Sequence, residues 1–270
     1  MNNLFVNFSC HSYLKFKSMK KLLIIMVVML FTVQMTKAQD NKIVDFSVTL
    51  ESNHLWRGLI ITDMPTLSLQ TTFFLNSERT WTAGFWGGQA LSRDSDGTHY
   101  KEIDYFIQYA NEFVSFGLWD LFNTRGADSP DIWNYDEKTT GHTIDFRSSF
   151  FFGESFPLRL EIDAILYGSG DMDVNGDQKY SMYTEVSYPL YNQEGIVVNG
   201  FVAAGYALNS DVNKNGNKSL YAEDSFNIVN VGLKLSKTVK IGTWSLPVNV
   251  MTMWNPATKF SRIQVAINLF

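Results

Sequence analysis

The chain has 270 residues, of which 45% are hydrophobic, 15% aromatic and only 18% charged. This composition excludes intrinsic disorder, which goes with many charges and few aromatic residues. The net charge of −5 and the pI of about 5.4 argue against nucleic-acid binding, and the single cysteine, Cys10, excludes both a disulfide framework and a thiolate zinc site.

The N-terminal segment 1–38 has the features of a secretory signal peptide. A pair of lysines precedes the apolar run 22–33, and small residues provide a cleavage site after Ala38. The run is shorter than the roughly 20 residues of a membrane-spanning helix; a signal-anchor helix is the alternative. We expect translation to start at Met19. Cleavage removes five lysines and no acid, which leaves a single domain over 39–270 with a net charge of −10.

Beyond residue 40, apolar and polar side chains alternate with the period of two that indicates β-strands. In the first such segment Val44, Phe46 and Val48 share one face, and Asp45 and Ser47 share the other. Most segments have about ten residues, close to the roughly 9–11 that a tilted strand needs to cross a bilayer. The twelve predicted strands are 42–52, 65–75, 81–91, 100–111, 113–122, 143–152, 158–167, 179–189, 195–207, 226–236, 243–254 and 258–270.

The connections between these strands alternate in length. Those after even strands are mostly short, such as 154–157 and 191–194, with 237–242 a little longer. Those after odd strands are long and polar, such as 123–142, except the last, 255–257. Outer-membrane barrels have short periplasmic turns and long external loops, and closure leaves no backbone amide unpaired in lipid. We therefore predict an all-β fold, a closed antiparallel up-and-down transmembrane β-barrel of about 12 strands, in the outer membrane of a Gram-negative bacterium.

The aromatic residues at the strand ends fit the same interpretation. Trp81, Trp119, Trp244 and Trp254 are expected to contribute to interfacial girdles against outer-membrane lipid, with core or rim positions as the alternative. The chain ends on Phe270, as chains delivered to the barrel-assembly machinery often do.

Motifs in residues 44–110 resemble those of the TorF family of bacterial porin-like proteins. His54-Leu55-Trp56-Arg57-Gly58 precedes Gly84-Phe85-Trp86-Gly87-Gly88 and Glu102-Ile103-Asp104-Tyr105. Members of that family open with an aromatic-Arg-Gly loop, followed by a Gly-x-Trp-Gly third strand and a Glu-x-Asp-aromatic fourth strand. Gly88 stands where the family usually has serine. The resemblance implies an exported barrel and a pore; the family's substrate is not established, so no solute follows from it.

If the apolar face of each strand meets lipid, the opposite face lines a lumen in which acids outnumber bases. Twelve strands leave a narrow passage. We expect a porin-like channel for small polar solutes with a slight cation preference; alternatively, Arg147 and Arg159 neutralise the acids as a cross-strand ladder. The residues predicted to line the pore are Glu102, Asp104, Asp145, Arg147, Arg159, Glu161, Asp163 and Glu185.

The first long loop is a candidate constriction. Trp56 and Arg57 would lie in the lumen if this loop folds inward. The guanidinium would then offer five donors to anionic or sugar-like solutes. The alternative is an ion pair between Arg57 and Asp63 or another loop acid.

Two later loops have the spacing of calcium ligands. Oxygen ligands at alternate positions, with glycine at the sixth, wrap a hard cation. The twelfth-position glutamate is missing from both loops, and the alternative is that these runs form tight turns. No other cofactor is expected. The candidate ligands are Asp171, Asp173, Asn175 and Asp177, and the second loop, 211–217, is similar.

Enzyme motifs are nearly absent, and we predict no catalytic residue. His54, His99 and His142 follow the predicted cleavage site, all in loops or at strand starts. A serine–histidine dyad assembled across strands would make the protein an outer-membrane lipid hydrolase. A non-conducting barrel that displays external binding loops is the other alternative.

Overall fold

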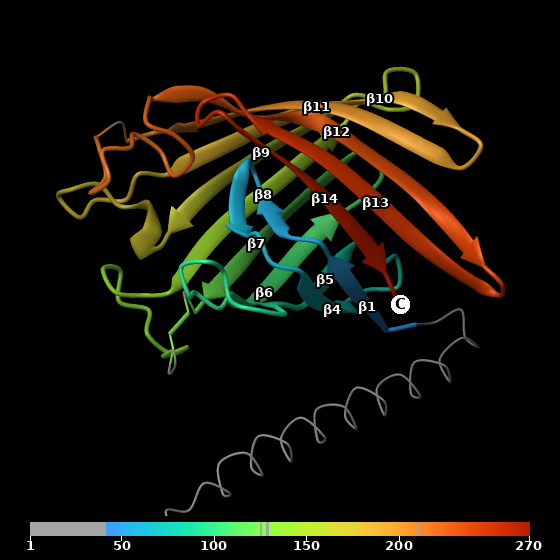
Figure 1. Cartoon of the computed structure of the whole chain (residues 1–270), viewed down its shortest axis with the longest axis horizontal. Helices are drawn as coiled ribbons and strands as arrows, with labels where there is room; N and C mark the ends of the chain where they lie inside the picture. Colours follow the sequence, from blue (N-terminus) through green and yellow to red (C-terminus); the bar gives the residue numbers. More distant parts are fainter. Residues whose placement is uncertain (1–41, 125, 128–129, 210) are drawn as a thin grey trace, which may run out of the picture. The chain divides into compact units, whose positions relative to one another are not determined.

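The computed structural model describes residues 42–270 except 125, 128–129 and 210, so the predicted signal peptide lies outside the described residues. Twelve strands form one closed antiparallel barrel, in which β1 pairs with β14 to complete the sheet (Figure 1). The prediction of an all-β, closed, twelve-stranded barrel is confirmed. The barrel strands are β1 (Val44–Glu51), β4 (Thr66–Phe74), β5 (Trp81–Ala90), β6 (Lys101–Ala110), β7 (Val114–Asn123), β8 (His142–Phe151), β9 (Arg159–Tyr167), β10 (Ser181–Gln193), β11 (Ile196–Ala207), β12 (Phe226–Ile241), β13 (Trp244–Asn255) and β14 (Phe260–Asn268).

Two predicted turns are shorter than expected. β10 continues past Pro189 to Gln193, and β12 continues to Ile241, so little remains of the turns predicted at 191–194 and 237–242. Proline cannot donate to the sheet and would normally end a central strand, but an irregular register next to it absorbs the missing bond. These strands therefore extend beyond the limits that their hydrophobic pattern predicted.

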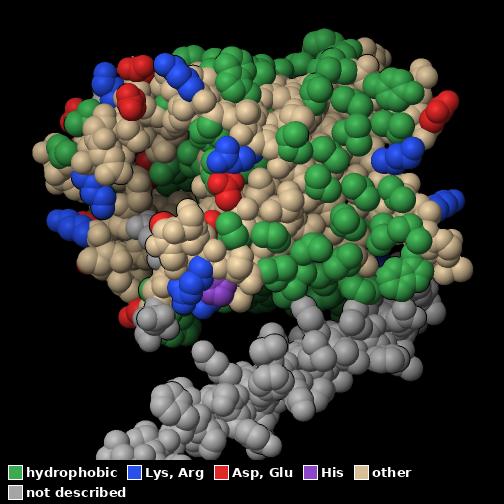
Figure 2. Space-filling view, viewed as in Figure 1, with side chains coloured by type: hydrophobic (Ala, Val, Ile, Leu, Met, Phe, Trp, Pro, Cys, Tyr) green, Lys and Arg blue, Asp and Glu red, His purple; other side chains and the backbone are tan. Residues whose placement is uncertain are grey.

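The outer face of the barrel is apolar. Exposed hydrophobic side chains alternate with inward polar ones, as Ile103 and Ile107 do with Glu102 and Asp104 on β6. In Figure 2, hydrophobic side chains cover much of the visible outer face, and most charged side chains lie toward the strand ends. A closed sheet with such an outer face matches what a barrel needs in lipid.

The long connections lie at one end of the barrel, as predicted. Because neighbouring strands are antiparallel, 91–100, 124–141, 168–180 and 208–225 all join strands at the same end. One of them contains a short 3-10 turn, η1 (Ser169–Asp171). In the described part of the chain, no helix is long and apolar enough to cross a membrane.

Three of the four predicted girdle tryptophans are exposed at strand ends. Trp81 and Trp244 begin their strands, and Trp254 lies next to the end of β13. The prediction is wrong for Trp119, whose ring faces the interior and stacks on Phe106 at 4.4 Å between centroids. The alternation of side chains along β7 places Trp119 on the inward face of the barrel. This inward direction explains why it does not join the exposed tryptophans, although it lies near the strand end.

The closing seam, meaning the β1–β14 pairing, is short. Only Thr49–Glu51 pair with Ala266–Asn268, whereas β1 pairs with β4 along its whole length. The part of β14 that precedes the seam, toward Phe260, lies at the end of the barrel with the long loops. Side chains of the first loop bond to this part of β14. Asn53 Nδ2 donates to the Ile263 carbonyl at 3.2 Å. The loop therefore completes the wall where β1 ends.

The first loop also contains two strands that the sequence did not predict. β2 (His54–Trp56) and β3 (Leu59–Thr62) form a separate hairpin between β1 and β4. Figure 1 shows this β2–β3 hairpin within the outline of the barrel. Its side chains Trp56 and Leu59 pack on the main buried cluster of the inner face, which consists of Tyr183, Ala203, Tyr221, Ala222 and Val229.

Candidate functional site: the lumen and its hairpin

The tip of the β2–β3 hairpin is a two-residue turn that needs left-handed backbone at both positions. Arg57 has φ 49° and Gly58 has φ 81°, the pattern of a type I′ turn. Glycine adopts this conformation freely, whereas arginine does so rarely. The contacts of the Arg57 side chain account for its presence in this turn.

Arg57 is buried between two carboxylates of the barrel wall. Its guanidinium donates to both oxygens of Asp145 on β8, at 3.0 and 2.9 Å, and lies 2.8 Å from Asp163 on β9. Tyr221 accepts a further hydrogen bond at 3.3 Å. The Asp145 and Asp163 side chains are fully buried. A buried charge is tolerated only when it is paired in this way.

The backbone of the hairpin tip also touches the opposite wall. A Cβ atom on Gly58 would lie 2.2 Å from the carbonyl oxygen of Val229 on β12. Asn255 at the end of β13 donates to the Gly58 carbonyl at 2.9 Å. The tip is therefore fixed against wall strands on both sides of the barrel, and the hairpin narrows the lumen.

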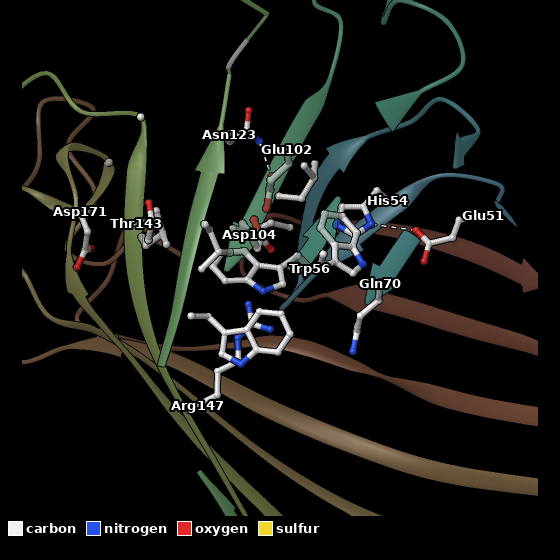
Figure 3. Close-up of a pocket in the computed structure, with 18 residues that line it drawn as sticks. Glu51, His54, Trp56, Gln70, Glu102, Asp104, Asn123, Thr143, Arg147 and Asp171 are labelled. Atoms are coloured by element: carbon white, nitrogen blue, oxygen red, sulfur yellow. Dashed lines mark hydrogen bonds and ion pairs between the residues drawn. The ribbon is translucent and has the colours of Figure 1, made fainter. Parts of the chain in front are cut away.

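A cavity of about 420 Å³ remains beside the hairpin (Figure 3). The hairpin residues Trp56 and Leu59 form part of its wall, and strands β4 to β8 contribute most of the rest, including Trp86 and Trp119. Among the described residues, four carboxylates line it and only one guanidinium, that of Arg147. The carboxylates are Glu51, Glu102, Asp104 and Asp171.

The predicted pore-lining residues divide into three groups. Glu102, Asp104 and Arg147 line the cavity, and Asp145 and Asp163 bind Arg57 instead of facing free solvent. The third group, Arg159, Glu161 and Glu185, neither lines the cavity nor forms an ion pair with Arg57.

Glu185, in this third group, is buried and pairs with Lys234 at 2.6 Å. Arg159 is exposed at the start of β9 and donates to Ser149 at 2.9 Å. Glu161 lies in phase with Asp163 on β9 and does not line the cavity. The predicted cross-strand ladder is not seen among the ion pairs of the described residues: Arg147 binds Asp145 of its own strand at 2.7 Å, and Arg159 forms no ion pair with an acid there.

Arg57 differs from both interpretations of the sequence. It lies inside the barrel, but its partners are wall carboxylates, so its donors are occupied. Asp63, the expected partner, pairs instead with Arg262 of β14 at 2.9 Å. Loop sequence alone does not distinguish these partners, since all are acids near the same end of the barrel.

From the sequence, Trp86 was named only as part of a motif and given no role, and Tyr183 and Tyr221 were not singled out. For Trp86 the signal was present, since it alternates with the exposed Phe85 and so faces inward. Tyr221 comes from the long loop 208–225, where no periodicity indicates which side chain turns toward the lumen.

Of the four predicted calcium ligands, Asp171 and Asp173 use their carboxylates to hold turns together. Asp173 accepts hydrogen bonds from the backbone of Asn175 and Asp177 at 2.8 and 2.9 Å. Asp171 accepts from the backbone and hydroxyl of Ser181. The backbone bonds lower the pKa of Asp173, while burial raises the pKa of Asp171. Within the described ranges no group of three or more His, Cys, Asp and Glu side chains is arranged to hold a metal. Calcium binding stays a prediction.

His142 is buried under the loop that precedes β8. Its Nδ1 lies 2.7 Å from Asp120, its Nε2 lies 2.8 Å from the Ile132 carbonyl, and Tyr135 stacks on its ring. Both ring nitrogens are thus occupied by groups other than a serine hydroxyl. The geometry gives the lipid-hydrolase alternative no support at this histidine.

A scan of protein-family models found no match to this chain. A comparison with curated protein sequences found no match either. The TorF resemblance therefore stays a hypothesis that rests on the motifs alone.

Proposed function

We propose that the chain forms a narrow outer-membrane channel that passes small polar solutes and prefers cations. The observation that carries this proposal is the charge of the remaining passage, where four carboxylates face one guanidinium. In a confined space with low-dielectric walls, such an excess raises the local concentration of cations and opposes anions.

The outer face and the loop arrangement support the location. The sheet closes through the β1–β14 seam, and the exposed side chains along it are largely apolar. A protein of this form requires outer-membrane lipid around it and the barrel-assembly machinery to insert it. No catalytic role and no cofactor enter the proposal.

Within the lumen, we assign selectivity to β6. Because Arg57 already neutralises part of the charge on Asp145 and Asp163, the carboxylates that face the passage are chiefly Glu102 and Asp104. The hairpin restricts the cross-section, so permeating ions pass close to these two groups.

Reversal potentials in a salt gradient across a planar bilayer test the proposal. The wild type should prefer cations, and the double variant Glu102→Gln, Asp104→Asn should lose most of that preference. Glu112→Gln, an exposed change in the β6–β7 turn, is the matched control and should behave like the wild type. Anion preference in the wild type, or equal potentials in all three proteins, would overturn the assignment.

The fixed hairpin favours a second candidate, a barrel that carries no current and displays its loops. The current of the wild type separates the two, and Arg57→Ala removes the ion pairs between the hairpin tip and the wall. Channel activity in the wild type supports a passage with a restricting hairpin. A wild type that carries no current favours the display role, whether or not Arg57→Ala conducts.

A further inference from the structure

Asp104 on β6 is a buried carboxylate that forms no ion pair with a basic side chain among the described residues. Its exposed fraction is 4%, and its Oδ1 atom has no hydrogen-bond partner among the described residues. It lines the cavity, where Figure 3 shows it amid the other lining side chains. An unpaired charged oxygen in such a place is costly, so a native structure is expected to provide a partner for it.

A second carboxylate lies on the same face of the strand. Glu102 is two residues away and also points inward, with an exposed fraction of 9%. It accepts one hydrogen bond, from Asn123 at 2.8 Å. Two neighbouring carboxylates of like charge require a compensating cation or proton.

The one guanidinium of the cavity is already engaged. The Nε of Arg147 donates to Asp145 at 2.7 Å, and its guanidinium carbon lies 4.1 Å from the ring centroid of Trp119. No ion pair joins Arg147 to Asp104 or Glu102 in the described part of the chain. The carboxylate pair therefore has no ion-pair partner among the described residues of the cavity, and its compensating cation or proton must come from elsewhere.

Aromatic rings surround this charge. Trp56, Trp86 and Trp119 all line the cavity, and the buried Nε1 of Trp119 has no hydrogen-bond partner among the residues described. The faces of aromatic rings attract organic cations, and carboxylates accept hydrogen bonds from ammonium groups. A calcium ion would need six to eight oxygen ligands, which two carboxylates do not supply.

We infer that this cavity is a binding site for a small organic ammonium compound with an apolar body. The ammonium group donates to Asp104 and Glu102, and the body lies against Trp56 and Trp86, since Phe106 and Arg147 already stack on the ring of Trp119. The volume of about 420 Å³ is within the range of small-molecule sites. The inference rests on the proposed channel, since it names the class of solute that the passage would select.

Titration calorimetry on the refolded full chain in detergent, with phenethylammonium as the probe, tests the site. Phenethyl alcohol has the same body without the charge, and phenylacetate has the opposite charge. We expect the ammonium compound alone to bind, and Asp104→Asn to weaken it by about 10- to 100-fold, as the loss of a charged hydrogen bond would. Glu112→Gln is the control and should bind like the wild type.

Glu102→Gln is a second variant, in case Asp104→Asn does not refold, and it should also weaken binding. Equal binding of the alcohol and the ammonium compound would overturn the inference, as would wild-type affinity in a folded variant of either carboxylate. The binding experiment and the current measurement can fail independently of each other. Binding without any current overturns the channel and leaves the site, whereas cation-selective current without binding overturns only the site.

Discussion

Replacing Arg57 by alanine removes the ion pairs between the hairpin tip and the barrel wall. The side chain donates two hydrogen bonds to Asp145 and lies 2.8 Å from Asp163, and both of these carboxylates are fully buried. The substitution leaves Asp163 without its arginine, and Asp145 with Arg147 alone. Breaking a buried ion pair from one side costs about 3–5 kcal/mol, so we expect the free energy of unfolding to fall by that amount.

Urea unfolding of the refolded protein, followed by tryptophan fluorescence, measures this change. Arg262→Ala is the matched control, because it also breaks a pair between the first loop and the wall, but that pair is more than a third exposed on both sides. Such pairs are worth about 0–1 kcal/mol. A further variant, Arg57→Met with Asp145→Asn and Asp163→Asn, removes all three charges and should recover much of the loss. Equal stability of Arg57→Ala and Arg262→Ala would refute the argument.

Three further predictions follow from the turns and loops. Gly58→Ala should lower the midpoint of urea unfolding well below that of Gly97→Ala, because both glycines have positive φ but only Gly58 touches another strand; equal midpoints would contradict the close packing of the tip. Cysteines at Lys214 and Ser77 should differ in intact cells, with a membrane-impermeant maleimide labelling only the former, and equal labelling would reject the orientation or the barrel in the membrane. In calorimetry, the loop around Asp173 should bind calcium in the sub-millimolar range or more weakly, and Asp173→Ala should abolish this heat; flat titrations of both proteins would leave the turn interpretation.

The barrel was predictable because its strands repeat one simple pattern. Most strands alternate apolar and polar residues over about ten positions, as β6 does from Lys101 to Ala110, and the unequal connections predict which ends of the strands carry the long loops. The alternation of apolar and polar residues does not predict the end of a strand correctly where the alternation stops but the strand continues. Pro189 within β10 and the polar end of β12 near Ile241 both resemble turns, yet pairing with the neighbouring strand continues through them.

The interior was predictable only as a set of inward-facing residues. Alternation identifies Asp104 and Asp163 as residues of one face, but it cannot indicate which of them has a partner. That depends on the hairpin, a loop segment whose position comes from contacts far apart in the sequence, such as Gly58 with Val229. The roles of the two aspartates therefore differ for a reason that no local pattern contains.

The short pairing of β1 with β14 has a consequence for the order in which the chain folds. These strands come from opposite ends of the sequence, so their contact has the largest sequence separation in the barrel and the slowest kind of closure. Three residue pairs form the seam, and Asn53 and Asp63, on either side of the hairpin, supply bonds to β14 beyond it. Those two residues reach β14 while the segment between them is seated in the lumen. We therefore expect completion of the wall and filling of the interior to occur together, late in folding.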